Sequence, residues 1–192
     1  METLIFATNN THKVTEIRKV TENLFTLITM REAGIDIDIP EPFDTLEENA
    51  REKSRAIYKM TGQNCFSEDT GLETNVLDGA PGVKSARYAG EGRSMEDNIQ
   101  KLLHELEGRD NRKAQFRTVI SLLLNGMEYQ FEGICSGIII TEKRGDSGFG
   151  YDPVFVPDGS SKTFAEMDIT EKNRFSHRKK AIDKLIRFLR KK

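Results

Sequence analysis

The sequence predicts an α/β fold, and two features carry that prediction. Residues 2–7 have the apolar pattern of a buried strand, residues 13–23 have that of a helix, and residues 25–29 have that of a second strand. This β-α-β order predicts parallel strands in a sheet that helices cover. Farther along, Asn125-Gly126 separates two strand-like runs within residues 114–141, which predicts a hairpin with a type I′ turn.

The middle of the chain carries clear signals for a helix start and a helix end. Thr45-Leu46-Glu47-Glu48 has the spacing of a capping box, and Gly62 follows the helix that this box predicts. The segment before it, residues 35–44, is acidic and contains prolines. A short strand is expected at residues 65–67, ending at Glu68-Asp69-Thr70-Gly71.

The second half of the chain predicts a loop and two further helices. Residues 79–93 are rich in Gly and Ala and predict a loop, whereas residues 94–107 predict a helix that Gly108 ends. A last helix is expected to begin near Ser176, because apolar residues recur with helical spacing after it. Its basic residues predict a solvated face: Lys180, Lys184, Arg187, Arg190, Lys191 and Lys192.

Composition bounds the class of protein. The 192 residues fit one domain, or one with two lobes, and charged residues make up 31% with a net charge of −2. A protein that binds nucleic-acid polymers usually has a basic excess, so the composition disfavours that partner. Residues 119–124 form only a strand-length apolar run, so no membrane span is expected. Two cysteines without metal-ligand spacing, and no signal-peptide pattern, predict a reduced, cytoplasmic protein.

The stretch Thr8-Asn9-Asn10-Thr11-His12-Lys13 places a lysine at the start of the first predicted helix. A cation is unfavourable there, because the first turn carries partial positive charge. A bound phosphate would resolve the conflict by accepting from backbone N–H groups and from the ammonium. The alternative is a polar turn in which Thr8 or Asn10 caps the helix. Both interpretations stay open at this point.

Glu68-Asp69 is the sharpest acidic feature, because adjacent carboxylates repel each other at a predicted strand end. Mg²⁺ would reverse that repulsion, since hard carboxylate oxygens are its preferred protein ligands. One carboxylate could instead hold a water as a general base. A solvated turn with Asp69 as a cap is the structural alternative. Glu41 is a weaker candidate to complete a metal site, and Glu48 is more simply a capping residue.

Two later stretches contain groups that suit a flat ligand. In Gly148-Phe149-Gly150-Tyr151-Asp152-Pro153, the phenylalanine could stack on a base or could anchor a turn in the core. At the start of the last helix, Lys172, His177 and Arg178 are donors that would suit a carbonyl-bearing purine or a phosphate.

The order of these motifs resembles the inosine triphosphate pyrophosphatase family, the house-cleaning XTP/dITP pyrophosphatases also called HAM1-like proteins. The resemblance covers essentially the whole chain. It rests on five stretches in succession: 8–13, 68–72, 79–90 (with Gly79-Ala80-Pro81-Gly82 and Ser85-Ala86-Arg87-Tyr88-Ala89-Gly90), 148–153 and 176–178. The chain departs from the family's usual residues at Asn9, Glu68 and Thr70.

The resemblance implies a Mg²⁺-dependent hydrolase that removes non-standard purine nucleotides (ITP, dITP and XTP) from the nucleotide pool. Cleavage between the α- and β-phosphates gives the monophosphate and pyrophosphate. It also implies an α/β fold with an elongated mixed β-sheet flanked by helices, in a single domain with two lobes and the active cleft between them. A homodimer is expected, with no nucleic-acid polymer and no membrane as partner.

Site residues follow from the same resemblance. Asp69 matches the proton acceptor and a metal ligand, with Glu68 and Glu41 as further metal candidates. Thr70 matches a substrate contact, and Lys53 a further phosphate contact. The triphosphate is expected at Thr8, Asn9, Asn10, Thr11, His12 and Lys13. The base is expected at Phe149, Gly150, Tyr151, Asp152, Lys172, His177 and Arg178.

Recognition is expected to use the 6-keto group, which would accept hydrogen bonds from His177 or Arg178, whereas a 6-amino group would leave those donors unpaired. Two other function classes stay open. A nucleotide-binding sensor would bind these triphosphates without turnover. An RNA- or DNA-binding module using the basic last helix would show affinity that falls steeply with salt.

Overall fold

The computed structural model describes residues 2–21, 24–92 and 94–191. The chain divides into two compact units. Unit 1 comprises Met1–Asp69, Thr118–Gly133 and Arg178–Lys192, and unit 2 comprises Thr70–Arg117 and Ile134–His177. In the described part of the chain, no helix combines the length and the apolar character that crossing a membrane requires.

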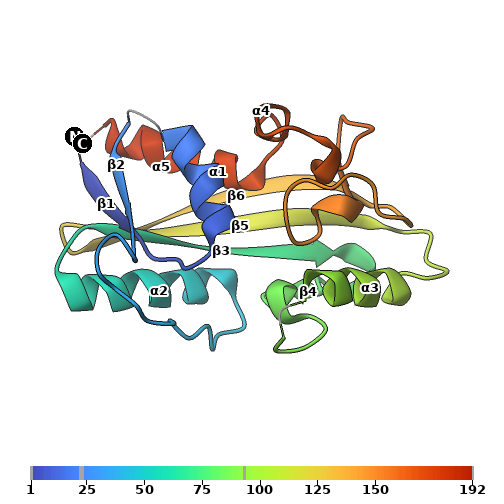
Figure 1. Ribbon diagram of the computed structural model, residues 1–192, viewed down its shortest axis with the longest axis horizontal. Coiled ribbons are helices and arrows are strands. Elements are labelled where there is room, and N and C mark those ends of the chain that lie inside the picture. Colours follow the sequence, from blue (N-terminus) through green and yellow to red (C-terminus); the bar gives the residue numbers. More distant parts are fainter. Residues whose placement is uncertain (1, 22–23, 93, 192) are drawn as a thin grey trace. The chain divides into compact units, whose positions relative to one another are not determined.

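The strands of the described residues form a seven-stranded mixed sheet in the order β2-β1-β3-β5-β6-β7, with β4 paired to β3. Strand β1 is parallel to β2 and β3, whereas β4 and β7 are antiparallel to β3 and β6. This confirms the prediction of a mixed sheet flanked by helices (Figure 1). The strands are β1 Thr3–Phe6, β2 Thr26–Thr29, β3 Cys65–Thr74, β4 Pro81–Gly82, β5 Lys113–Leu124, β6 Met127–Ile139 and β7 Phe155–Pro157.

The longer helices begin and end where their capping residues direct. Thr45 accepts a hydrogen bond from the backbone N–H of Glu48, which confirms the predicted helix start, and Gly62 ends the helix with a φ of 66°. The capping box itself is only half formed, because the Glu48 carboxylate accepts from the Thr45 hydroxyl and not from its backbone. The helices are α1 Thr11–Thr21, α2 Leu46–Thr61, α3 Met95–Glu105, α4 Ile169–Lys172 and α5 His177–Leu189. Short 3₁₀ turns cover Asn75–Leu77, Ser85–Arg87, Asp152–Val154 and Phe164–Glu166.

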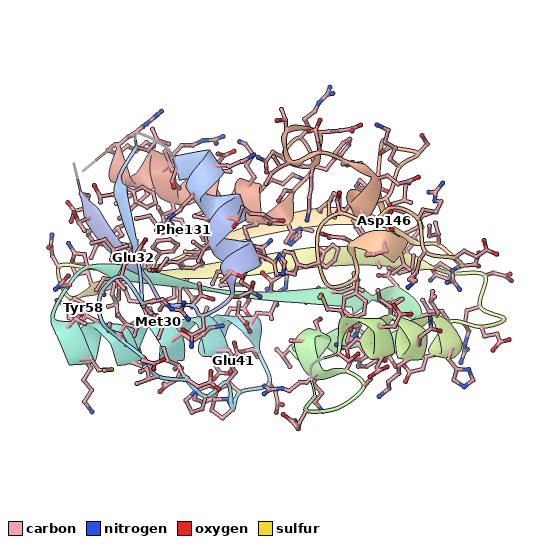
Figure 2. All side chains as sticks on the ribbon, in the orientation of Figure 1. Met30, Glu32, Glu41, Tyr58, Phe131 and Asp146 are labelled. Atoms are coloured by element: carbon pink, nitrogen blue, oxygen red, sulfur yellow. The ribbon has the colours of Figure 1, made fainter. Side chains whose placement is uncertain are left out.

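Helices cover both faces of the sheet in unit 1 (Figure 1). Because neighbouring strand residues point to opposite faces, Leu4 and Phe6 pack under α1 and α5, whereas Ile5 and Ala7 pack on the α2 side. Figure 2 shows Phe131 on the first side and Tyr58 on the second. Strands buried on both faces are what a helix-covered parallel sheet requires.

Unit 2 has its own core, in which aromatic rings pack against aliphatic side chains. Phe116 and Phe155 meet edge to face with ring centroids 4.7 Å apart, and Phe164 packs 5.2 Å from Phe155. Leu102 of α3 and Tyr151 are buried in the same cluster.

The predicted hairpin is confirmed, because β5 and β6 are joined by Asn125-Gly126 alone, with positive φ values of 51° and 79°. Three predictions need correction. The strand predicted at residues 65–67 is wrong in length, since β3 continues to Thr74. The loop predicted over 79–93 is wrong at β4 and at Ser85–Arg87, and Arg93 lies outside the described residues. The first helix begins at Thr11 and not at Lys13, and the expected end, Asn23, also lies outside them.

Candidate active site

Strand β3 distributes its side chains to two different sets of partners. On one face, Cys65 donates to the carbonyl of Ser54 and Ser67 to that of Ala50, both on α2, and Asp69 continues this row. On the other face, Phe66 stacks on Phe6 beneath α1 and α5, and Glu68 continues that row. The two adjacent carboxylates therefore point in opposite directions. They are not the strand end that the sequence predicts, since both lie inside β3.

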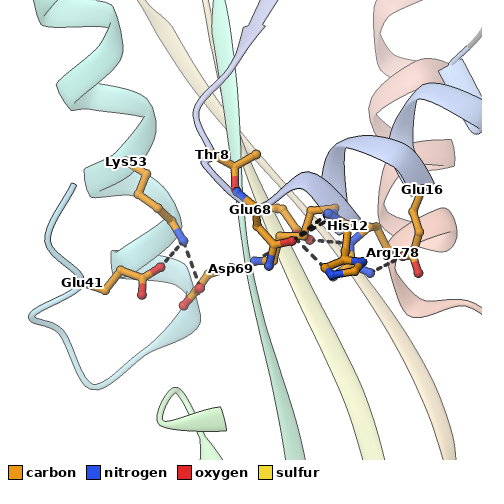
Figure 3. Close-up of polar contacts among 10 residues, drawn as sticks. Thr8, His12, Glu16, Glu41, Lys53, Glu68, Asp69 and Arg178 are labelled. Atoms are coloured by element: carbon orange, nitrogen blue, oxygen red, sulfur yellow. Dashed lines mark hydrogen bonds and ion pairs between the residues drawn. The ribbon is translucent and has the colours of Figure 1, made fainter. Parts of the chain in front are cut away.

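Glu68 is the centre of a buried ion cluster. Its carboxylate lies 2.9 Å from the Lys13 ammonium of α1 and accepts from Arg178 Nε of α5 at 3.1 Å (Figure 3). The same guanidinium donates through Nη1 to Glu16, one turn along α1 from Lys13. The Glu68 side chain is fully buried and that of Arg178 is 3% exposed. The first turn of α1 thus tolerates a lysine because Glu68 faces it.

Electrostatics keep the Glu68 cluster ionised. Burial alone would raise the pKa of Glu68, but Arg178 and Lys13 hold that pKa well below its usual range. Burial opposes the charged form of Arg178 as well, yet Glu68 and Glu16 raise the pKa of its guanidinium. The cluster Lys13–Glu68–Arg178–Glu16 carries two positive and two negative charges and is neutral as a whole.

Asp69 belongs to a second cluster on the α2 side. The Lys53 ammonium lies 3.0 Å from Asp69 Oδ1 and 2.6 Å from Glu41 Oε1, so it bridges the two carboxylates (Figure 3). Burial raises the pKa of Asp69 above its usual range, against the opposing charges of Lys53 and Lys13. Burial also opposes the charged form of Lys53, but Asp69 and Glu41 raise its pKa. The solvated turn considered for Asp69 is wrong, because the residue is only 7% exposed.

The stretch before α1 is organised as a helix cap. Asn10 Oδ1 accepts from the backbone N–H groups of His12 and Lys13, at 3.0 and 3.2 Å, and Thr8 Oγ1 accepts from the backbone of Asn10. The expectation that Asn10 caps the helix is confirmed. Asn9 donates through its side-chain amide to the Ile37 carbonyl at 2.8 Å, in the segment that leads to Glu41. Of the neighbouring candidates, Thr11 and His12 are exposed, and Thr70 is half-buried next to Asp69.

The donor set around Lys53 has the chemistry that a magnesium ion prefers. Mg²⁺ usually takes one or two protein carboxylates together with substrate phosphates and water, and Glu41 and Asp69 converge on one point. Glu68 is not part of this pair, because its carboxylate is turned to Lys13 and Arg178. Within the described part of the chain, no group of three or more His, Cys, Asp or Glu side chains is arranged to hold a metal. Two carboxylates match the one or two that Mg²⁺ usually takes from a protein.

Unit 2 holds the Phe149 to Asp152 motif around a buried ion pair. Asp152 Oδ2 accepts from Lys172 Nζ at 2.6 Å and from the backbone of Phe149 at 2.9 Å. Gly148 has a φ of 79°, and a Cβ there would lie 2.1 Å from this carboxylate, so only glycine fits. The Lys172 ammonium also lies 5.4 Å from the centroid of the half-buried Phe149 ring.

His177 and Tyr151 are held more tightly than free recognition groups would be. The His177 ring stacks on Phe116 with centroids 4.7 Å apart and an interplanar angle of 13°. Tyr151 is buried and donates through its hydroxyl to the Ser85 carbonyl at 2.9 Å. Gly150 is half-buried, and its N–H points to Met95 Sδ at 3.0 Å.

Sequence reasoning missed Glu16, Phe116 and Phe164. Glu16 stands three residues after Lys13, which places both on one face of α1. That spacing was a usable signal for a shared cluster. The two phenylalanines are ordinary apolar positions in the sequence, and only the fold brings them to His177.

Comparison with known proteins gives one consistent result. Residues 4–188 match the model of the Ham1 family. The chain is 50% identical to the dITP/XTP pyrophosphatase of Porphyromonas gingivalis and 47% identical to that of Christiangramia forsetii, with at least 98% of each chain covered. Solved structures of Ham1 proteins from Staphylococcus aureus (39% identity, 98% of each chain) and Coxiella burnetii (37% identity, 100% of each chain) superpose with TM-scores of 0.89 and 0.91. Because the family model, these relatives and these structures all span nearly the whole chain, this protein belongs to the Ham1 family.

Proposed function

We propose that this protein is a Mg²⁺-dependent nucleoside triphosphate pyrophosphatase that acts on dITP, XTP and ITP. The observation that carries the proposal is the pair of cationic and acidic clusters on the two faces of β3, with Lys13 in one and Lys53 in the other. Relatives of nearly the same length are named dITP/XTP pyrophosphatases. Removal of these nucleotides from the pool would be the consequence in the cell.

Charge balance supports a metal in the reaction. The two clusters together contain three cations and four acids, so they carry a net charge of −1 when all are ionised. The cations are Lys13, Lys53 and Arg178, and the acids are Glu16, Glu41, Glu68 and Asp69. A triphosphate is a polyanion and would be repelled by that set alone. Held by Asp69 and Glu41, Mg²⁺ would supply the missing positive charge and polarise the phosphoryl oxygens.

The chain's own groups then divide the work of hydrolysis. Asp69 orients a water for attack on the α-phosphorus and takes its proton as the new P–O bond forms. The bond from that phosphorus to the α,β-bridging oxygen breaks, and pyrophosphate leaves with the electron pair. Lys13 and Lys53 neutralise charge on the phosphates, since phosphoryl transfer depends mainly on positioning and electrostatic stabilisation.

Recognition of the base is assigned to unit 2, with Phe149 as a stacking surface and Lys172 and His177 as donors. Arg178 stays a candidate donor, but its guanidinium already serves Glu68 and Glu16. A group built to donate to a 6-keto oxygen rejects adenine, because a 6-amino group leaves the donor unpaired.

The test is pyrophosphate release from dITP, XTP, ITP, GTP and ATP, with Mg²⁺ and with a chelator. We expect release from the first three and none in chelator. Binding of these triphosphates without release would instead establish a sensor without turnover. The homodimer implied by the family stays a prediction, which light scattering coupled to gel filtration checks.

A further inference from the structure

Lys53 stands where the proposed reaction needs a divalent cation. Its ammonium is within hydrogen-bond distance of both Glu41 and Asp69, the two carboxylates assigned above to the metal (Figure 3). Lys53 is 7% exposed, so little water screens these charges. A lysine ammonium and a metal ion therefore compete for the same carboxylate oxygens.

We propose that Lys53 is a built-in counter-ion, which keeps the Glu41–Asp69 pair closed to a divalent cation until a triphosphate takes the ammonium. The inference rests on the proposed function, because that function assigns the metal to these carboxylates. Metal and triphosphate then bind together. Both carboxylates face a cation before and after the exchange, so no buried charge is left unpaired.

The exchange requires only small movements. The ammonium lies 2.6 and 3.0 Å from the two oxygens, and Mg–O bonds are about 2.1 Å, so each carboxylate would approach by about 1 Å or less. The backbone beneath Lys53 is fixed: the Ser54 hydroxyl hydrogen-bonds Ser121 at 2.8 Å, and the Ala50 carbonyl accepts from Ser67. The flexible stem of the lysine is therefore the part that moves.

Lys13 offers a direct contrast on the other face of β3. Its partner Glu68 is also held by Arg178, at 3.1 Å, so Glu68 keeps a cation when Lys13 turns toward a phosphate. Among the described residues, the Lys53 ammonium is the one cation within ion-pair distance of Asp69, and Lys13 acts on it only from farther away. Departure of Lys53 therefore leaves the Asp69 carboxylate facing the like charge of Glu41. Release of Lys53 thus calls for an incoming cation, whereas release of Lys13 does not.

The experiment is a Mn²⁺ titration followed by electron paramagnetic resonance, without nucleotide, on the native protein, Lys53→Met and Lys13→Met. Methionine keeps length and removes charge, and the two variants differ only in the face of β3 that loses its cation. We expect Lys53→Met to bind Mn²⁺ at least about tenfold more tightly than the native protein, since a close buried charge is removed. Lys13→Met should stay within about threefold of the native value. Adding Glu41→Gln to Lys53→Met should abolish the gain.

Unchanged Mn²⁺ affinity in Lys53→Met would overturn the proposal. A urea unfolding curve checks that this variant is folded. If it is not, Lys53→Gln replaces it, because this substitution also removes the charge while keeping a polar end. The same tightening of at least about tenfold is expected, and unchanged Mn²⁺ affinity in that folded variant contradicts the inference. Failure of this inference can be distinguished from failure of the proposed function. Native protein that binds Mn²⁺ tightly without nucleotide and still hydrolyses dITP would refute only the role of Lys53.

Discussion

Glu68 and Asp69 are neighbours in the chain, yet the folded protein places them in opposite environments. Glu68 faces two cations, Lys13 and Arg178, which lower the pKa of its carboxyl against the effect of burial. Asp69 shares one ammonium with Glu41, and burial raises the pKa of its carboxyl. The Glu68 carboxylate is thus held as an anchor between two cations, whereas the Asp69 carboxylate is suited to exchange a cation or a proton.

The alternation of a β-strand produces this division. One residue step on β3 changes the partner helices from α1 and α5, which supply Lys13 and Arg178, to α2, which supplies Lys53. Two carboxylates on one face would have shared the same cations and the same pKa shift. Substitutions that act on one face of β3 only can test this division.

The largest effect is expected for the carboxylate that the account makes a base. Asp69→Asn keeps the size of the side chain but removes its proton-accepting oxygen. We expect the kcat for dITP hydrolysis to fall about 10³-fold, within the usual range for general-base removal. Pyrophosphate release at saturating dITP measures it. A variant with more than about a tenth of the native rate would remove Asp69 from this role.

Lys13→Met is the next substitution in size of effect. It removes the cation that Glu68 positions, and we expect kcat/KM for dITP to fall about 10²-fold, mainly through KM. Lys19→Met on the exposed face of the same helix is the matched control and should leave kcat/KM unchanged. An equal fall in kcat/KM in both variants would mean that the overall charge of the protein, and not the Glu68 cluster, determines how well the triphosphate binds.

Acid should weaken the fold through Glu68. The pKa of its carboxyl in the folded protein lies below its ordinary value of 4.5, so the unfolded chain binds the proton more strongly. The ion pairs are fully present above about pH 4.5, and their stabilisation is lost as pH falls through the lowered folded-state pKa. Urea unfolding between pH 7 and pH 3 should show this loss, and Glu68→Gln should flatten it. A slope as steep in the variant as in the native protein would assign acid sensitivity to other groups.

Glu16→Gln should lower stability less than the loss of Glu68 does, because Arg178 keeps Glu68. Loss of one charged hydrogen-bond partner predicts a fall of about 1–2 kcal/mol in the free energy of unfolding, measured by urea titration at pH 7. Glu32→Gln is the control, since Glu32 pairs with Arg18 of the same helix, and this pair is about half-exposed and should matter less. A larger loss in the control would show that burial of the Glu16–Arg178 pair adds nothing to the free energy of unfolding.

Local signals in the sequence were sufficient for several elements. The Thr45 N-cap and the Asn125-Gly126 turn each act within a few residues, and both formed as expected. The length of β3 was not predictable in this way. Residues 68–71, which follow Ser67, include poor strand formers, so local propensity predicts that the strand stops there. Pairing with β4 and burial of Leu72 override that local propensity and extend β3.

In the site too, local motifs were predictable from the sequence, whereas contacts made by the fold were not. Motif order identified Asp69, Lys13 and Lys53 as candidates, and the structure gives each a charged partner. The partners themselves depend on tertiary structure, since Arg178 meets Glu16 across 162 positions of sequence. The place of Arg178 in the sequence, directly after His177, gave no indication that its side chain joins the Glu68 cluster. Only the packing of α5 against α1 explains it.

Urea unfolding of Glu68→Gln and Asp69→Asn at pH 7 distinguishes the carboxylate that anchors from the carboxylate that exchanges. We expect the free energy of unfolding to fall by about 3 kcal/mol or more in Glu68→Gln, because two buried cations lose their shared carboxylate. In Asp69→Asn it should change by about 1 kcal/mol or less, since the Lys53 ammonium keeps Glu41. Equal losses in the two variants, or a larger loss in Asp69→Asn, would contradict the account.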